Sequence, residues 1–187
     1  MASSVTITKE DVINRAKAIV ASHGWEYLNA RGLAKELGVS TKPLYRMFKG
    51  MEEIKDLVYE SIYKFYDEFV TSRIDKEKAL ITLCVAYIEF AQEHKNLFKT
   101  IFLSNNLDWK NIDSVLDEKW NQSAIVNLVN KHGFTFESAK TLFMHIWLYS
   151  NGLATLLATN DIHLDSNDIV KRIVTVYKDL VKWKMKE

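Results

Sequence analysis

Residues 29–49, Asn-Ala-Arg-Gly-Leu-Ala-Lys-Glu-Leu-Gly-Val-Ser-Thr-Lys-Pro-Leu-Tyr-Arg-Met-Phe-Lys, have the pattern of two short helices joined by a tight turn. Asn29 is placed to cap the first helix, because its side-chain oxygen can accept a free backbone N–H in the opening turn. Gly38 follows that helix, at a point where many helices end in a left-handed residue. Ser40 is expected to cap the second helix, and Pro43 falls in its first turn, where a missing N–H costs nothing. The spacing predicts a helix-turn-helix.

The second helix has a polar, basic and aromatic outer face. Leu44 and Phe48 are spaced i, i+4 and are expected to face the core. This leaves five side chains outside: Thr41, Lys42, Tyr45, Arg46 and Lys49. Such a face suits the major groove of DNA and the flanking phosphates. The alternative is an ordinary helical hairpin with a solvated polar face, and spacing alone does not separate the two.

Composition indicates a folded chain with a basic first quarter. The 187 residues are 48% hydrophobic and include one Pro and six Gly, which is typical of a globular protein with a substantial core. The formal net charge of +1 excludes a chain that is polybasic throughout. Residues 1–55 contain nine basic and six acidic side chains, whereas the remainder contains sixteen and eighteen. This asymmetry fits a DNA reader joined to a domain that does not bind DNA.

Cys84 is the only cysteine, so neither an intrachain disulfide nor a cysteine metal cluster can form. Its apolar neighbours predict a buried thiol. We see no signal peptide and no apolar stretch long enough for a bilayer. We therefore expect a cytoplasmic protein that needs no membrane, metal or cofactor.

Helical periodicity extends along nearly the whole chain, and no run of alternating residues is long enough for a sheet. The pattern predicts an all-α fold of about nine helices, three in a DNA-binding head (residues 1–50) and six in a helical bundle for ligand binding and dimerisation (residues 51–187). Outside the helix-turn-helix, we expect helices at about 9–22, 51–73, 76–93, 97–103, 109–131, 138–159 and 167–184.

Residues 8–58 resemble the tetracycline-repressor (TetR) family of transcriptional regulators. The resemblance rests on Gly24-Trp25, on the quoted stretch 29–49 and on Glu52-Glu53-Ile54. It implies an all-helical homodimer that binds a palindromic operator, usually represses transcription and is released by a small molecule bound in the body. Two positions depart from the family pattern, since Met47 stands where the family often has His and Met51 where it often has a phosphate-binding Lys. Lys49 and Lys55 are the available substitutes for that lysine.

The DNA contacts divide by position along the second helix. Thr41 and Lys42 lie at its start and are best placed for base edges, while Pro43 offers an apolar contact to a thymine methyl. We expect the remaining contacts to reach phosphates, from side chains or helix N-termini. These residues are Asn29, Ser40, Tyr45, Arg46 and Lys49.

The predicted dimer uses the last two long helices, because residues 142–157 are apolar on more than one face. The expected interface residues are Tyr149, Gly152, Leu153, Leu157, Val176, Leu180 and Trp183. The alternative is a helix buried within one protomer.

Aromatic density in the body predicts a cavity for a hydrophobic or aromatic effector. The candidate residues are Tyr87, Phe90, Phe98, Phe102, Trp120, Phe143, Met144 and Trp147. For each of them, plain core packing is the alternative role.

Two other function classes compete with the DNA-binding regulator. We do not expect an enzyme, and no catalytic residue is assigned, because the chain lacks a nucleophile elbow, a phosphate-cradling glycine loop and a His-Glu-x-x-His motif. The other alternative is a TetR-fold adaptor or coactivator that works through a protein partner with weak or no DNA binding. The departures at Met47 and Met51 leave the adaptor open, whereas four retained residues argue against it: Lys42, Tyr45, Arg46 and Lys49.

Overall fold

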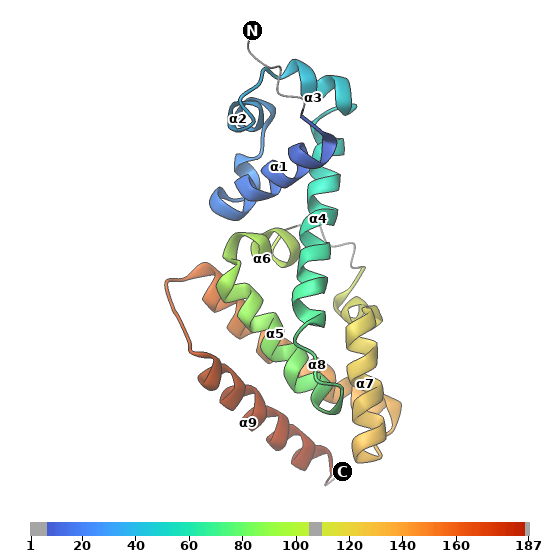
Figure 1. Cartoon of the computed structure of the whole chain (residues 1–187). Coiled ribbons are helices and arrows are strands. Elements are labelled where there is room, and N and C mark those ends of the chain that lie inside the picture. Colours follow the sequence, from blue (N-terminus) through green and yellow to red (C-terminus); the bar gives the residue numbers. More distant parts are fainter. Residues whose placement is uncertain (1–6, 105–109, 186–187) are drawn as a thin grey trace. The chain divides into compact units, whose positions relative to one another are not determined.

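The computed structural model describes residues 7–104 and 110–185, and within these ranges the chain is all-helical, with no strand (Figure 1). In this described part of the chain, nine α-helices are joined by short connections and three 3₁₀ turns, which confirms the predicted fold class. In chain order, the elements are α1 (Lys9–His23), η1 (Trp25–Tyr27), α2 (Ala30–Glu36), α3 (Lys42–Met47), α4 (Met51–Thr71), η2 (Lys76–Lys78), α5 (Ala79–Glu93), α6 (Lys95–Phe102), η3 (Ile112–Asp117), α7 (Lys119–His132), α8 (Phe136–Thr159) and α9 (Ser166–Lys184).

Side-chain caps fix where several helices begin. At the start of α1, the Thr8 hydroxyl accepts from the Asp11 N–H at 3.1 Å, and the Asp11 carboxylate accepts from the Thr8 N–H at 2.8 Å. Asp165 accepts from the Asp168 N–H at 2.8 Å ahead of α9. These contacts satisfy backbone donors that the first turn of a helix leaves free, so the boundaries follow from local sequence.

The helix predicted over 109–131 is wrong in its first half. Glu118 is extended, with φ −64° and ψ 134°, and α7 therefore begins only at Lys119. The preceding residues form η3 instead, capped by the Asn111 side chain. Trp109, the predicted first residue, lies outside the described residues. Likewise, the helix predicted from residue 76 begins as η2 and becomes α-helical only at Ala79.

The described residues divide into two compact units, and the division falls within α4, after Tyr66. The first unit holds α1, α2, α3 and most of α4, and it includes α6 from Asn96 onward. The Asn96 amide donates to the Ala21 carbonyl at 3.0 Å, which attaches α6 to the last turns of α1. The core of this unit is mostly apolar, with Thr100 as a buried polar residue, and includes Val12, Ala16, Val20, Leu33, Leu44, Ile54, Val58, Ile62, Phe98 and Ile101.

The second unit packs α7, α8 and α9 around α5. Helix α5 is buried on most of its surface, as expected for a central helix. Cys84 on this helix is buried as predicted, and burial raises the pKa of its thiol to about 12, which disfavours the reactive thiolate. Across the ranges that the structure describes, no helix has the length and apolar character needed to span a membrane.

Gln92 holds the connection between α8 and α9. Its amide donates to the Leu164 carbonyl at 2.9 Å and accepts from the Leu164 N–H at 2.8 Å. We expect Gln92→Ala to lower the free energy of unfolding by about 1–3 kcal/mol, because both backbone groups of Leu164 lose their partner. Urea unfolding measures this loss. Gln92→Glu keeps the acceptor and removes the donor, so its free energy of unfolding should lie between those of the parent protein and Gln92→Ala. Equal stability of all three proteins would contradict the assigned role.

Candidate nucleic-acid interface

The turn between α2 and α3 forms as the sequence predicts. Asn29 caps α2, with its side-chain oxygen accepting from the Gly32 N–H at 2.9 Å and its amide donating to the Tyr27 carbonyl at 3.0 Å. Gly38 has φ +68°, the left-handed conformation that ends α2, and the Val39 N–H returns to the Ala34 carbonyl at 3.0 Å. This closed turn sets the direction in which α3 leaves.

Gly38→Ala is expected to cost about 1–2 kcal/mol of stability, because an L side chain is strained at this φ. A Cβ at Gly38 would meet no atom within 4 Å, so backbone strain is the only cause. Thermal unfolding measures the change. Gly50→Ala is the matched control, since its Cβ is equally free and its φ is not positive. Equal stability of the two variants would contradict the strained turn.

Ser40 does not cap α3, which corrects the prediction for that residue. The cap position is Thr41, whose φ of −71° and ψ of −18° are already helical, and no side chain accepts a hydrogen bond there. A capping side chain reaches the N–H groups from an extended cap residue, so this backbone prevents the expected contact. Ser40 is exposed immediately before the helix, and Pro43 lies in the first turn as predicted.

Helix α3 turns Leu44 and Phe48 into the core and leaves its cationic face outside. Tyr45 is 56% exposed despite its size. Lys42, Arg46 and Lys49 are also exposed, while Thr41 and Pro43 are half-buried. Figure 1 shows α3 as a short helix that follows α2 directly.

Two acidic side chains of this unit form ion pairs with residues outside α3. Glu36 lies 3.9 Å from Arg15, and Glu52 lies 3.0 Å from Lys55. Within the described part of the chain, no carboxylate pairs with Lys42, Arg46 or Lys49. Because residues 27–50 hold five basic side chains and one acidic one, this surface keeps a concentrated positive charge.

Glu53 supports this surface, a role that the sequence analysis did not find. Its carboxylate accepts from the Lys49 N–H at 2.6 Å and lies 3.8 Å from the Lys9 ammonium. The same ammonium lies 4.9 Å from the centre of the Phe48 ring. Glu53 thus joins the exit of α3 to the start of α1 and α4. The spacing of four residues from Lys49 is the signal that could have pointed to it.

The ion pair of Lys55 affects which cation can replace the phosphate-binding lysine that is absent at Met51. Since the Lys55 ammonium is held by Glu52 at 3.0 Å, Lys49 is the cation left available beside the start of α4.

Four of the predicted effector residues lie deep in the cores. Phe90, Phe98 and Phe143 are fully buried, and Tyr87 is nearly so, with its hydroxyl donating to Asn151 Oδ1 at 2.8 Å. Phe98 and Phe102 belong to the first unit, where their ring centres are 5.1 Å apart, and the other six belong to the second.

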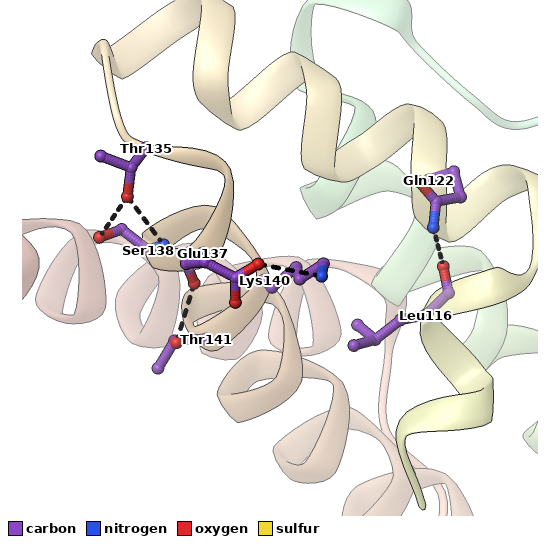
Figure 2. Close-up of polar contacts among 7 residues, drawn as sticks. All are labelled: Leu116, Gln122, Thr135, Glu137, Ser138, Lys140 and Thr141. Atoms are coloured by element: carbon purple, nitrogen blue, oxygen red, sulfur yellow. Dashed lines mark hydrogen bonds and ion pairs between the residues drawn. The ribbon is translucent and has the colours of Figure 1, made fainter.

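Two of the remaining predicted residues border hollows of the second unit. Trp120 donates from Nε1 to Asp67 Oδ1 at 2.7 Å and lines a hollow of about 450 Å³. Met144 lines another of about 380 Å³, together with Leu116, Lys140 and Thr141. Figure 2 shows the contacts beside this second hollow, where the Gln122 amide donates to the Leu116 carbonyl at 2.6 Å and Lys140 pairs with Glu137 at 3.1 Å.

The exposed apolar residues of α8 form a stripe that contains Leu156 in place of the predicted Leu157. Leu157 is fully buried within its own chain and is not available to a partner, which corrects that prediction. The neighbouring Leu156 is 53% exposed, and Leu148 is exposed two turns earlier. Of the other predicted residues, Tyr149, Gly152 and Trp183 are exposed, and Leu153, Val176 and Leu180 are half-buried. The ring of His145 stacks on Trp183 with 5.6 Å between centres, which joins α8 to α9.

No family model and no curated protein matches this chain. Among solved structures, it is similar to the fatty acid degradation regulator FadR from Bacillus halodurans, with a TM-score of 0.56 and 18% sequence identity. The match covers 96% of this chain and 97% of that one. At this identity, the likeness establishes a shared fold over nearly the whole length.

Proposed function

We propose that this protein is a DNA-binding transcriptional regulator of the tetracycline-repressor family, with α3 as its recognition helix. The observation that carries the proposal is the outer face of α3, where exposed Lys42, Tyr45 and Arg46 lie on a helix-turn-helix and no carboxylate of the described residues pairs with the two cations. The likeness in fold to a solved fatty acid degradation regulator, along almost the whole chain, supports a regulatory role.

The geometry of α3 suggests a division of roles. Thr41 and Lys42 start the helix, so they enter the major groove first, and the lysine can donate to guanine O6 or N7. Pro43 adds an apolar contact to a thymine methyl. Tyr45, Arg46 and Lys49 contact phosphates, with Asn29 and Ser40 at the flanks. Phosphate contacts give affinity and salt dependence, while base contacts give sequence choice.

The proposed regulator acts as a homodimer on a palindromic operator. The support is the exposed apolar stripe on α8, which includes Leu148, Tyr149 and Leu156. At Gly152 in this stripe, a Cβ would meet nothing within 4 Å, so the backbone leaves room for a partner helix to approach closely. A two-fold axis through such an interface pairs two recognition helices, and the operator must then be an inverted repeat.

Leu156→Glu is expected to convert the dimer into folded monomers, because a charge at the centre of an apolar interface loses its hydration on association. Sedimentation analysis measures the change in mass. Val126→Glu on α7 is the matched control, since Val126 is 48% exposed and lies outside the proposed interface. Equal effects of the two substitutions, or a monomeric parent protein, would contradict the interface.

We further propose that the regulator represses transcription until a small hydrophobic or aromatic molecule binds the second unit. Helix α4 begins just after the recognition helix in the chain and ends in the second unit, so it is a covalent link through which a ligand would act. The ligand shifts the population only by its difference in affinity between the DNA-binding and released states.

The first experiment is a gel shift across a salt series, with DNA from upstream of the protein's own gene and from its divergent neighbour. We expect saturable, salt-sensitive binding, and footprinting should show protection over an inverted repeat. Weak binding of equal strength to unrelated DNA would overturn the proposal and favour an adaptor that works through a protein partner.

A further inference from the structure

A groove of about 590 Å³ runs between α5 and α9 in the second unit, and neither the proposed DNA contacts nor the proposed dimer uses it. One wall is formed by Ile81 and Val85 of α5, and the facing wall by Val170 and Val174 of α9. Each pair is spaced i, i+4, so each wall is a continuous apolar rail. Val170 is 40% exposed, which leaves apolar surface open to solvent along the groove.

The groove lies on a different side of α9 from the proposed dimer interface. Val176 follows Val170 by six residues, and Leu180 follows Val174 by six residues. At about 100° per residue, each interface residue therefore points about 120° away from the groove valine six positions before it. A second copy docked on the α8 stripe therefore leaves these valines uncovered.

The two ends of the groove differ in charge. Gln92 near the end of α5 holds Leu164 just before α9, so the two helices run in opposite directions, as Figure 1 shows. Towards the start of α5 lie Lys78 and Lys131. The Lys131 ammonium donates to the Glu77 carbonyl at 3.2 Å, and no carboxylate pairs with either lysine in the ranges that the structure covers.

The acidic residues of the groove are otherwise engaged. Asp75 accepts from the Glu77 N–H at 2.9 Å and caps η2. Glu89 lies two turns beyond Ile81, and its carboxylate lies 3.6 Å from Arg73 Nε. Among the described residues, the groove thus has two ammonium groups without an ion-pair partner at one end and the Arg73–Glu89 ion pair at the other, and its lining carries three basic and two acidic side chains.

We propose that this groove binds a soluble aliphatic carboxylate of medium length. Its carboxylate lies between Lys78 and Lys131, and its hydrocarbon chain lies along the two apolar rails. The groove extends about 12 Å along α5 from Ile81 to the ion pair at Glu89, at the helical rise per residue, which sets the length of chain that fits. Burial of methylene groups supplies the affinity, and the two lysines supply the preference for an anion.

The test is equilibrium dialysis of radiolabelled decanoate against the full-length protein without DNA. We expect one saturable site per chain, with decanol and decyltrimethylammonium as weaker competitors. Val170→Trp fills the groove from an exposed position and should weaken binding at least about tenfold. Lys78→Gln with Lys131→Gln should reduce affinity and remove the preference for decanoate over decanol. Lys171→Gln, an exposed lysine of α9 outside the groove, should leave both unchanged.

Circular dichroism of each variant establishes that it is folded. Unchanged decanoate binding by a folded Val170→Trp variant would place the ligand elsewhere, including the effector cavity, and would overturn the proposal. So would equal binding of decyltrimethylammonium, or binding to phosphatidylglycerol vesicles without binding of free decanoate. A change in oligomeric state in Val170→Trp without decanoate binding to the parent would assign the groove to a second copy. None of these results depends on DNA binding, so the two proposals fail separately.

Discussion

Replacement of both Tyr45 and Lys49 with alanine is expected to weaken DNA binding about 100-fold, on the operator and on unrelated DNA alike. Both side chains are exposed on or just beyond α3, and we assign both to phosphates rather than to base edges. Loss of phosphate contacts removes affinity without changing sequence preference, because every sequence presents the same backbone. Gel shifts of the variant on both DNAs measure the two losses directly.

The salt dependence makes the same test sharper. Each phosphate that a lysine neutralises adds about 0.9 to the slope of log affinity against log salt, so a dimer that loses Lys49 twice should lose about two units of slope. Lys178→Gln, which removes one exposed charge from α9, is the control for a change in net charge alone. Operator binding by the double variant that equals the parent's would show that the contact assignment is wrong.

Lys49 also shows why its surroundings were harder to predict than its exposure. The apolar spacing of Leu44 and Phe48 is enough to place Lys49 outside. The same spacing does not predict the hydrogen-bond partner of the Lys49 N–H, because Glu53 reaches back from α4 and also contacts Lys9 of α1. A contact that joins three elements depends on their packing, and no local pattern specifies it.

The two predicted caps of the helix-turn-helix show the same limit at shorter range. Asn29 acts through its side chain on residues two and three positions away, and Gly38 acts through its own backbone, so the sequence was sufficient for both. Ser40 had the right chemistry, yet Thr41 is already helical and no cap forms. The identity of a residue shows what its side chain can accept, but the backbone dihedrals of the first turn decide whether the donor is within reach.

Helix α8 shows what periodicity leaves undecided. Its apolar residues occur on several sides, and the pattern therefore predicted burial without separating its own core from a partner. Leu157 faces the core and Leu156 faces solvent, a difference of one residue that only the packing of α5 and α9 resolves. The attachment of α6 to α1 is of the same kind, since Asn96 and Ala21 are far apart in sequence.

Phe143→Ala is expected to lower the free energy of unfolding by about 3–5 kcal/mol, even though Phe143 was predicted to line an effector cavity. The side chain is only 1% exposed, so its truncation removes buried apolar surface and leaves a void in the second unit. A cavity wall behaves differently, because its ring already borders open space and its truncation enlarges that space at smaller cost. Urea unfolding without any effector separates the two roles.

Met144→Ala is the matched comparison, since Met144 is half-buried on the adjacent position and lines a hollow. Its truncation should cost about 1 kcal/mol, because the side chain is only partly buried and already borders open space. If Phe143→Ala is as mild as Met144→Ala, the ring borders a cavity and the effector assignment gains support. If Phe143→Ala costs several times more, Phe143 belongs to the core, and residues that border the hollows, such as Trp120 and Met144, become the better starting points for locating an effector.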